Sequence, residues 1–208
     1  MATDRGASPF NWSGFYAGAQ VGQSWTTADH ASRWLTGDVY STSNELNRVI
    51  GGAYAGMNMQ TERRLVFGVE GGVRFGDVSD RGGEYYENGI PTGVPAGYAH
   101  AEWSVGARAR IGYAVNRFLP YIAVGFAVER VRVGYEVSWA SNYGRDTMIG
   151  LSLGGGLEYA LTGNVIARLD YRYADFGGRT LLVGGNWTTL ANIDLDRHDL
   201  MFGLAYKF

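Results

Sequence analysis

Charged side chains recur at alternate positions within apolar runs, and their spacing suggests pairing across strands. Glu158 and Arg168 lie equally far on either side of a turn near Gly163, so we expect them to face each other across a hairpin. Glu70 and Arg110 are expected at similar heights on two other adjoining strands. Charges in a closed interior need partners, because burial removes their hydration. We predict an interior ion network of Glu70, Arg74, Arg108, Arg110, Glu158, Arg168, Asp170 and Arg172.

Two patterns have some of the residues needed for nucleophilic catalysis, but each lacks a required part. Gly150-Leu-Ser152-Leu-Gly154 matches G-x-S-x-G by letter, yet that motif needs a sharp strand-to-helix turn that exposes the serine. Ser152 falls instead within a run of period two. His198 has Leu200 where a His-x-Ser arrangement would place the hydroxyl for it to activate. We therefore expect no enzymatic activity and no catalytic residues.

The remaining candidate ligands are sparse. His30 and His100 are separated and are expected in loops or at a rim, where a haem or metal role stays open. The chain contains no cysteine, which excludes disulfides and thiolate chemistry. The glycine-rich segment 51–56 lacks the Lys-Ser/Thr of a phosphate loop. We expect no bound cofactor and no metal site.

These residues must be positioned by strands, because apolar residues recur with a period of two. Each alternating run, continued into its flanks, approaches the roughly 9–11 residues of a tilted membrane-spanning strand. By contrast, no segment approaches the ~18 continuous apolar residues that favour a spanning helix. The sequence predicts an all-β, eight-stranded antiparallel up-and-down transmembrane barrel. Its strands are expected around residues 15–25, 48–58, 65–75, 102–113, 122–129, 149–159, 165–173 and 198–208.

The connections are expected to alternate in length. Short links fall near residues 61–64, 115–118 and 162–164, and long polar connections near 28–44, 79–97, 137–146 and 177–192. A barrel with both termini in the periplasm has this arrangement, with its long loops extracellular. We predict an N-terminal periplasmic segment over 1–13 and a single barrel over 14–208. The start lacks an apolar signal-peptide core, so we expect a mature form from which the signal has been removed.

Composition distinguishes a membrane barrel from a soluble barrel such as a lipocalin, whose strands also alternate apolar and polar residues. Glycine occupies 32 of 208 positions, and Lys207 is the only lysine among 18 basic residues. A water-facing surface usually carries many lysines, serines and threonines, whereas here the second face carries arginines, carboxylates and glycines. We favour the membrane barrel. The net charge of −2 gives no reason to expect nucleic acid as a partner.

The C-terminal run alternates strictly and stops on an aromatic residue. In a bacterial outer-membrane barrel such a strand faces lipid and places its last ring in the interface girdle. It also resembles the signal read by the barrel-insertion machinery, which we expect as a partner during biogenesis. The residues expected to form this signal are Phe202, Leu204, Tyr206 and Phe208.

Four segments carry a resemblance to a known family. The stretches 11–22, 117–121, 170–177 and 198–208 resemble the first strand, a periplasmic turn, the seventh strand and the closing strand of the alphaproteobacterial outer-membrane surface-antigen family. These are small porin-like or outer-membrane-protein-A-like barrels. The resemblance implies a structural outer-membrane protein that supports envelope integrity and associates with lipopolysaccharide. For some relatives it also implies haemin binding or host contact.

Three hypotheses about function follow from these observations. The first is a structural barrel whose interior is plugged by the Arg/carboxylate network; an eight-stranded interior has room only for side chains or one small ligand. The second is a small-solute porin or channel. The third is loop-mediated binding of haemin or a host surface. The sequence does not identify the partners of the loops.

Three arginines are expected to contact lipopolysaccharide. Arg130 and Arg132 share the outward parity of Val124 and Phe126, unless a bulge in this strand reverses it. Both lie roughly 33–38 Å along the membrane normal from the turn near residue 117, beyond the ~25 Å apolar band. Lipid A phosphates occur at that height and accept bidentate hydrogen bonds from guanidinium groups. Arg145, across the loop, is the weaker candidate.

Overall fold

The computed structural model describes the backbone of residues 10–33, 39–76, 84–87, 90–95, 98–137, 140–183 and 189–208. Side chains are described within 10–25, 47–76, 103–130, 147–177 and 196–208. No helix in these parts is long and apolar enough to span a membrane. The described strands are β1 Gly14–Arg33, β2 Val39–Gln60, β3 Leu65–Phe75, β4 Glu84–Glu87, β5 Ile90–Pro95, β6 Tyr98–Tyr113, β7 Phe118–Val137, β8 Ala140–Ala160, β9 Val165–Val183 and β10 Thr189–Lys207.

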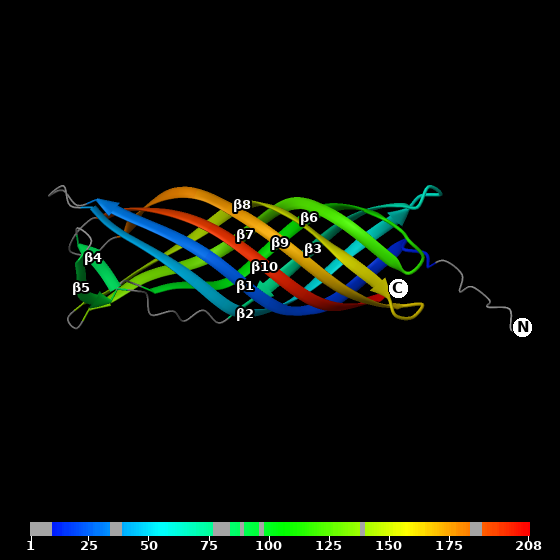
Figure 1. The fold of residues 1–208 in the computed structure, drawn as a ribbon, viewed down its shortest axis with the longest axis horizontal. Coiled ribbons are helices and arrows are strands. Elements are labelled where there is room, and N and C mark those ends of the chain that lie inside the picture. The colour runs from blue at the N-terminus through cyan, green and yellow to red at the C-terminus, as the bar shows by residue number, and fades with distance from the viewer. Residues whose placement is uncertain are drawn as a thin grey trace, which may run out of the picture.

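Eight of these strands close into an antiparallel barrel, as the alternation predicted (Figure 1). The order around the wall is β1-β10-β9-β8-β7-β6-β3-β2, and the pairing of β1 with β2 completes the ring. In the part of the wall where all eight strands pair with both neighbours, closure removes the free sheet edges. The remaining two strands, β4 and β5, form a hairpin that joins β2 through Tyr40 and Glu87.

The two faces of the wall carry opposite kinds of side chain. Large apolar residues such as Phe126, Leu151 and Phe202 are exposed on the outside. The buried side chains are mainly those of alanines, tyrosines, serines, arginines and carboxylates, with a few larger apolar residues such as Met148 and Met201. A soluble barrel would bury its large apolar side chains, so this distribution requires an apolar environment around the wall.

Tight turns gather at one end of the barrel, together with the C-terminus (Figure 1). Asn116 and Arg117 form one of these turns, in which Val115 and Phe118 exchange two backbone hydrogen bonds of 2.8 and 2.9 Å. Asn116 has a φ of 54°, a left-handed conformation that asparagine tolerates better than most residues. Residues 118–121, expected as part of this turn, belong to β7.

At the opposite end the strands run further than expected, and three of the predicted loops are corrected. The β1–β2 ladder continues to Arg33 and Val39, the β7–β8 ladder to Val137 and Ala140, and the β9–β10 ladder to Val183 and Thr189. Most of the expected loops 28–44, 137–146 and 177–192 is therefore strand. Alternating apolar residues are needed only where a wall meets lipid, and polar residues form the same backbone ladder beyond it. Within the fourth expected loop, 79–97, lie β4 and β5.

We expect the close approach of β6 and β7 to be sensitive to one added methyl group. A Cβ at Gly125 would lie 2.1 Å from the Ala107 carbonyl oxygen, whereas one at Gly163 would meet nothing within 4 Å. Gly125→Ala should therefore lower the free energy of unfolding by about 1–3 kcal/mol. Gly163→Ala, the matched control, should change it by less than about 0.5 kcal/mol. Urea titration in detergent micelles measures both, and equal midpoints would contradict the expectation.

The charged barrel interior as candidate functional site

A layer of three arginines and three carboxylates crosses the barrel interior. Its members come from β3, β6, β8 and β9, and all are buried. In each strand the charged residues occupy positions whose side chains point inward. Neighbouring glycines leave room for these long side chains. The layer consists of Glu70, Arg108, Arg110, Glu158, Arg168 and Asp170.

Glu158 is held by two guanidinium groups. Arg110 donates to both of its oxygens, from Nη1 at 2.8 Å and from Nη2 at 2.5 Å, which is a bidentate fork. Arg168, its Cα partner on β9, donates to Oε1 from Nε at 2.8 Å and from Nη2 at 2.6 Å. Glu158 and Arg168 therefore face each other across the hairpin, as predicted. Arg110 is a second partner of Glu158 at an equally short distance.

Glu70 links opposite sides of the wall. Its Oε2 accepts a 2.5 Å hydrogen bond from Arg168 Nη2, although β3 and β9 lie four strands apart in an eight-stranded ring. Its Oε1 accepts from Arg108 at 2.9 and 2.7 Å, and Tyr16 donates to Oε2 at 2.8 Å. The residue directly opposite Glu70 in the β3–β6 ladder is Arg108 rather than Arg110. The Nη1 atom of Arg110 lies 3.5 Å from Glu70 Oε2. The expected alignment of Glu70 with Arg110 is therefore offset by one inward position.

Asp170 completes the layer and reaches a fourth arginine. Arg108 donates to Asp170 Oδ1 at 3.0 Å and lies 2.8 Å from Oδ2, and the Tyr121 hydroxyl donates to Oδ2. Arg172 lies one inward position further along β9, and its Nη2 is 3.6 Å from Asp170 Oδ1.

Tyrosine rings pack against the guanidinium planes of this layer. The Cζ atom of Arg168 lies 4.0 Å from the Tyr54 ring centroid, and that of Arg110 lies 4.2 Å from the Tyr121 centroid. Both distances are within the range of cation–π attraction, which is stronger where water is excluded. The rings therefore pack against the charged groups and stabilise them.

A second charged layer lies further from the tight turns, and the sequence analysis did not include most of it. Arg74 donates to Asp199 and, at 3.0 Å, to Ser104, while Arg197 donates to Glu129 and lies 3.4 Å from Asp199. Of these residues only Arg74 was predicted. Glu129 and Asp199 have the inward parity of their strands, which is the signal that identifies them.

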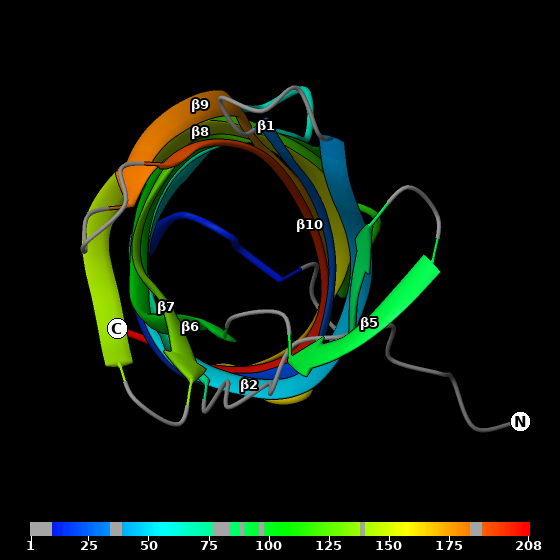
Figure 2. The same cartoon turned by 90° about the vertical axis from the view of Figure 1, so that its left-hand side faces the viewer.

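Apolar residues lie at the end of the barrel that carries the tight turns. Phe10 and Trp12 are buried, with ring centroids 4.7 Å apart, and Figure 2 shows the N-terminal segment crossing the far opening. The backbone N–H of Trp12 donates to Gln60 Oε1 at 2.8 Å, and the backbone N–H of Gln60 donates to Ser13 Oγ at 2.9 Å. The described part of the expected N-terminal segment 1–13 therefore packs into the barrel mouth.

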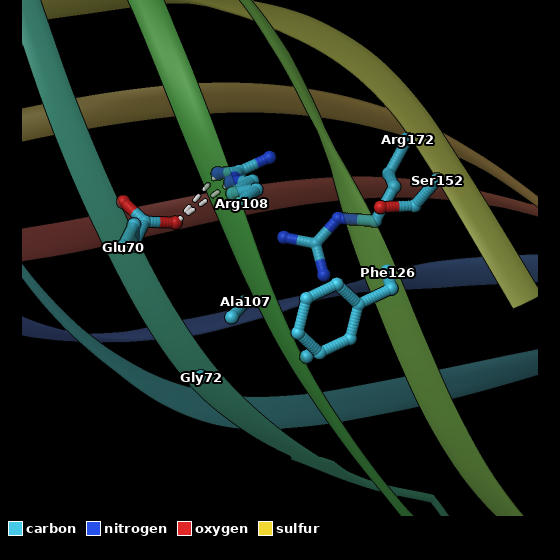
Figure 3. A pocket seen from close by; sticks show the side chains of 8 residues that line it. Glu70, Gly72, Ala107, Arg108, Phe126, Ser152 and Arg172 are labelled. Atoms are coloured by element: carbon cyan, nitrogen blue, oxygen red, sulfur yellow. Dashed lines mark hydrogen bonds and ion pairs between the residues drawn. The ribbon is translucent and has the colours of Figure 1, made fainter. Parts of the chain in front are cut away.

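A small cavity lies beside the charged layer. The side chains of Glu70, Arg108, Ser152 and Arg172 contribute to its lining, and Figure 3 shows how they lie. Ser152 is buried within β8, in a strand without the sharp turn that a nucleophilic serine requires.

Outside the barrel, His198 makes contacts with two tyrosines. Its Nδ1 lies 2.8 Å from the Tyr171 hydroxyl, and its ring centroid lies 5.0 Å from that of Tyr173. Leu200 occupies the position where a His-x-Ser pair would carry the hydroxyl. The side chains of His30 and His100 lie outside the described residues.

The three arginines predicted to contact lipopolysaccharide lie on the paired strands β7 and β8. The β7–β8 register runs unbroken from Phe118 to Val137, so Arg130 keeps the parity of Val124 and Phe126 and is half-buried. The only register shift near Arg130 in the β6–β7 pairing falls on β6, between Ala101 and Trp103. The alternative of a bulge within β7 is therefore wrong.

Arg132 and Arg145 are Cα partners in the same β7–β8 ladder. Their side chains lie outside the described residues. The backbone nevertheless brings the two positions together across neighbouring strands, two residues beyond Arg130 along β7.

Comparison with known proteins identifies the family. The model of the outer membrane protein beta-barrel domain matches residues 7–208. The chain belongs to this family. The 25 kDa outer-membrane immunogenic protein of Brucella abortus is 31% identical over 202 residues, which cover 97% of this chain and 82% of that protein. The resemblance predicted from the first and last strands is confirmed, and the protein is located in the bacterial outer membrane.

Solved structures show the same barrel fold. Pseudomonas aeruginosa OprG superposes with a TM-score of 0.61 at 13% identity, covering 96% of this chain and 98% of that one. Neisserial surface protein A gives a TM-score of 0.54 at 20% identity, with coverages of 94% and 98%. Both likenesses support the barrel fold of this chain.

We expect the Glu158 cluster to be sensitive to loss of one negative charge. Glu158→Gln removes the bidentate carboxylate partner of Arg110 and one of the two carboxylates that hold Arg168, so that Glu70 must serve both. The cost in the free energy of unfolding is up to about 3–5 kcal/mol. Glu62→Gln, in an exposed tight turn, is the matched control and should have a negligible effect. Equal urea midpoints for wild type and Glu158→Gln would show that the pair does not contribute.

The double reversal Glu158→Arg/Arg168→Glu tests the same cluster. From the hairpin pair alone, reversal would be expected to restore part of the lost stability. The bidentate fork from Arg110 changes this expectation, because an arginine at 158 would then face Arg110. The reversal should be no more stable than Glu158→Gln in the same urea titration.

Proposed function

We propose that the protein is a structural component of the outer membrane whose lumen does not conduct, and that it is not an enzyme. The observation that carries this proposal is the contact between Glu70 and Arg168, because it joins strands on opposite sides of the ring. A side-chain layer that reaches across the whole diameter obstructs the passage of solute, which supports the proposal.

Two further features support a closed lumen. The second layer also joins non-adjacent strands, through Arg74 and Asp199 and through Arg197 and Glu129. At the end with the tight turns, Trp12 and Leu119 are buried in an apolar cluster. Three successive obstructions of different chemistry favour a plug over a gated pore.

Conductance in planar bilayers tests this proposal against the porin alternative. We expect no sustained openings from the wild-type barrel, because the charged layers and the apolar cluster obstruct one lumen in series. A wide porin inserted into the same membrane is the positive control. Sustained, well-resolved openings of the wild-type protein would overturn the plugged barrel and support the small-solute channel.

The second part of the proposal is that the barrel contacts lipopolysaccharide and so supports the integrity of the envelope. Arg130, Arg132 and Arg145 lie on two paired strands at the end away from the tight turns. In the outer leaflet the anionic groups at that level are lipid A phosphates, for which arginine is well suited. The expected loops are the regions where a haemin or host-surface partner would act, and nearly all of their side chains lie outside the described part of the chain.

Replacement of two arginines tests the lipopolysaccharide contact. Arg130→Ala/Arg132→Ala should reduce the amount of lipopolysaccharide that co-purifies with the folded barrel, and adding Arg145→Ala should reduce it slightly further. The matched control is Arg63→Ala/Arg64→Gly, which removes two arginines from the opposite end. Glycine suits residue 64, whose φ is 65°.

The readout is lipopolysaccharide per mole of protein, with heat-modifiable gel migration as the measure of folding. An undiminished amount in Arg130→Ala/Arg132→Ala would contradict the contact. An equal loss in the control would point to a non-specific effect of net charge.

A further inference from the structure

The ion network around Asp170 contains one positive charge more than its carboxylates neutralise. Arg172 joins the three arginines of the first layer, against three carboxylates. A guanidinium group stays protonated in proteins, and each carboxylate contributes at most one negative charge. The connected set therefore has a net charge of +1 inside the barrel, where charge is poorly solvated.

The excess is localised at Arg172. Its closest carboxylate contact among the described residues is the 3.6 Å approach to Asp170, which already accepts from Arg108 and Tyr121. Its Nε–H is buried without a hydrogen-bond acceptor in the described part of the structure. Asp199 also acts on Arg172 through space, but Asp199 is paired with Arg74.

The cavity beside Arg172 is small and has donors on its wall. Its accessible volume is about 10 Å³, which is enough for about one water molecule. Ser152 lines it from β8 with a hydroxyl group that can donate, and Figure 3 shows the Arg172 side chain reaching inward beside it. A polyatomic anion such as phosphate exceeds this space.

Glu70 also lines the cavity, and its charge would repel an anion if it were free. Both of its oxygens are engaged: Oε1 accepts from Arg108, and Oε2 accepts from Tyr16 and Arg168. Its negative charge is therefore directed at two guanidinium groups. The positive charges on the cavity wall are Arg108, which is paired with Glu70 and Asp170, and Arg172.

We propose that Arg172 and Ser152 form an internal binding site for one small monovalent anion, such as chloride. The Arg172 guanidinium supplies the charge and the Ser152 hydroxyl a second donor, and the bound ion neutralises the network around Asp170. The site is independent of the lipopolysaccharide contact and does not require a conducting lumen.

Bromide replacement tests occupancy directly. In crystals of the detergent-solubilised wild-type protein grown in bromide, we expect an anomalous-difference peak in contact with Arg172 and Ser152. The peak should be absent in Arg172→Gln and retained in Arg63→Gln, which removes an exposed arginine at a tight turn. A wild-type structure without a peak would show that the cavity holds water only and would overturn the proposal.

Thermal unfolding in chloride or gluconate at constant ionic strength gives a second test. Wild type and Arg63→Gln should gain stability with chloride, because a ligand that binds only the folded state raises the midpoint. Arg172→Gln should lose this response. In gluconate it should be at least as stable as wild type, because it removes an uncompensated charge.

The behaviour of Arg172→Gln in gluconate separates an anion site from a structural ion pair. If Arg172 served only to pair with Asp170, the variant would be less stable than wild type in both salts. Ser152→Ala keeps the charge and should raise the dissociation constant for chloride by about tenfold, or 1.4 kcal/mol. If Arg172→Gln does not fold, an unchanged chloride response in Ser152→Ala together with no bromide peak in wild type would reject the site.

Discussion

The contact between Glu70 and Arg168 joins β3 to β9 across the full width of the barrel, and the other interior side chains are arranged around it. Arg108 and Tyr16 hold Glu70, and Glu158 holds Arg168. Because these partners come from strands far apart in the sequence, the layer connects the wall from within, in addition to the backbone ladder. A buried ion pair is not by itself strong evidence for stability, but removal of one partner leaves an uncompensated charge. The network therefore resists any change that separates the strands.

An outer-membrane barrel faces a physical constraint that a soluble barrel does not. Its outer face meets acyl chains, so exposed residues such as Leu151 and Leu153 need no partner within the chain. Specific packing must then come from the lumen, and here that packing is charged. Arginine suits this task better than lysine because its planar fork engages two acceptors at once, as Arg110 does with Glu158. Among the described side chains, the buried cations are all arginines.

Glycines make the charged interior sterically possible. A Cβ at Gly68 would lie 3.0 Å from Arg110 Cγ, and one at Gly56 would lie 2.5 Å from the Tyr16 hydroxyl oxygen. The long arginine and tyrosine side chains therefore occupy space that neighbouring glycines leave open. The abundance of glycine and the presence of buried arginines are two aspects of the same packing. A barrel of this diameter accommodates a continuous charged layer only if the positions beside it are nearly bare.

The sequence by itself determined the features that depend on local pattern. Period-two alternation fixes which side chains share a face, so the strand number and the inward parity of Glu70, Arg108 and Asp170 were predictable. Equal spacing from a turn fixes partners within one hairpin, as for Glu158 and Arg168. Only the tertiary structure decided the contacts across the lumen, such as Glu70 with Arg168 and Glu129 with Arg197. Those contacts depend on the tilt and stagger with which the ring closes. Tilt and stagger are properties of all eight strands together, so the sequence of a single strand does not reveal them.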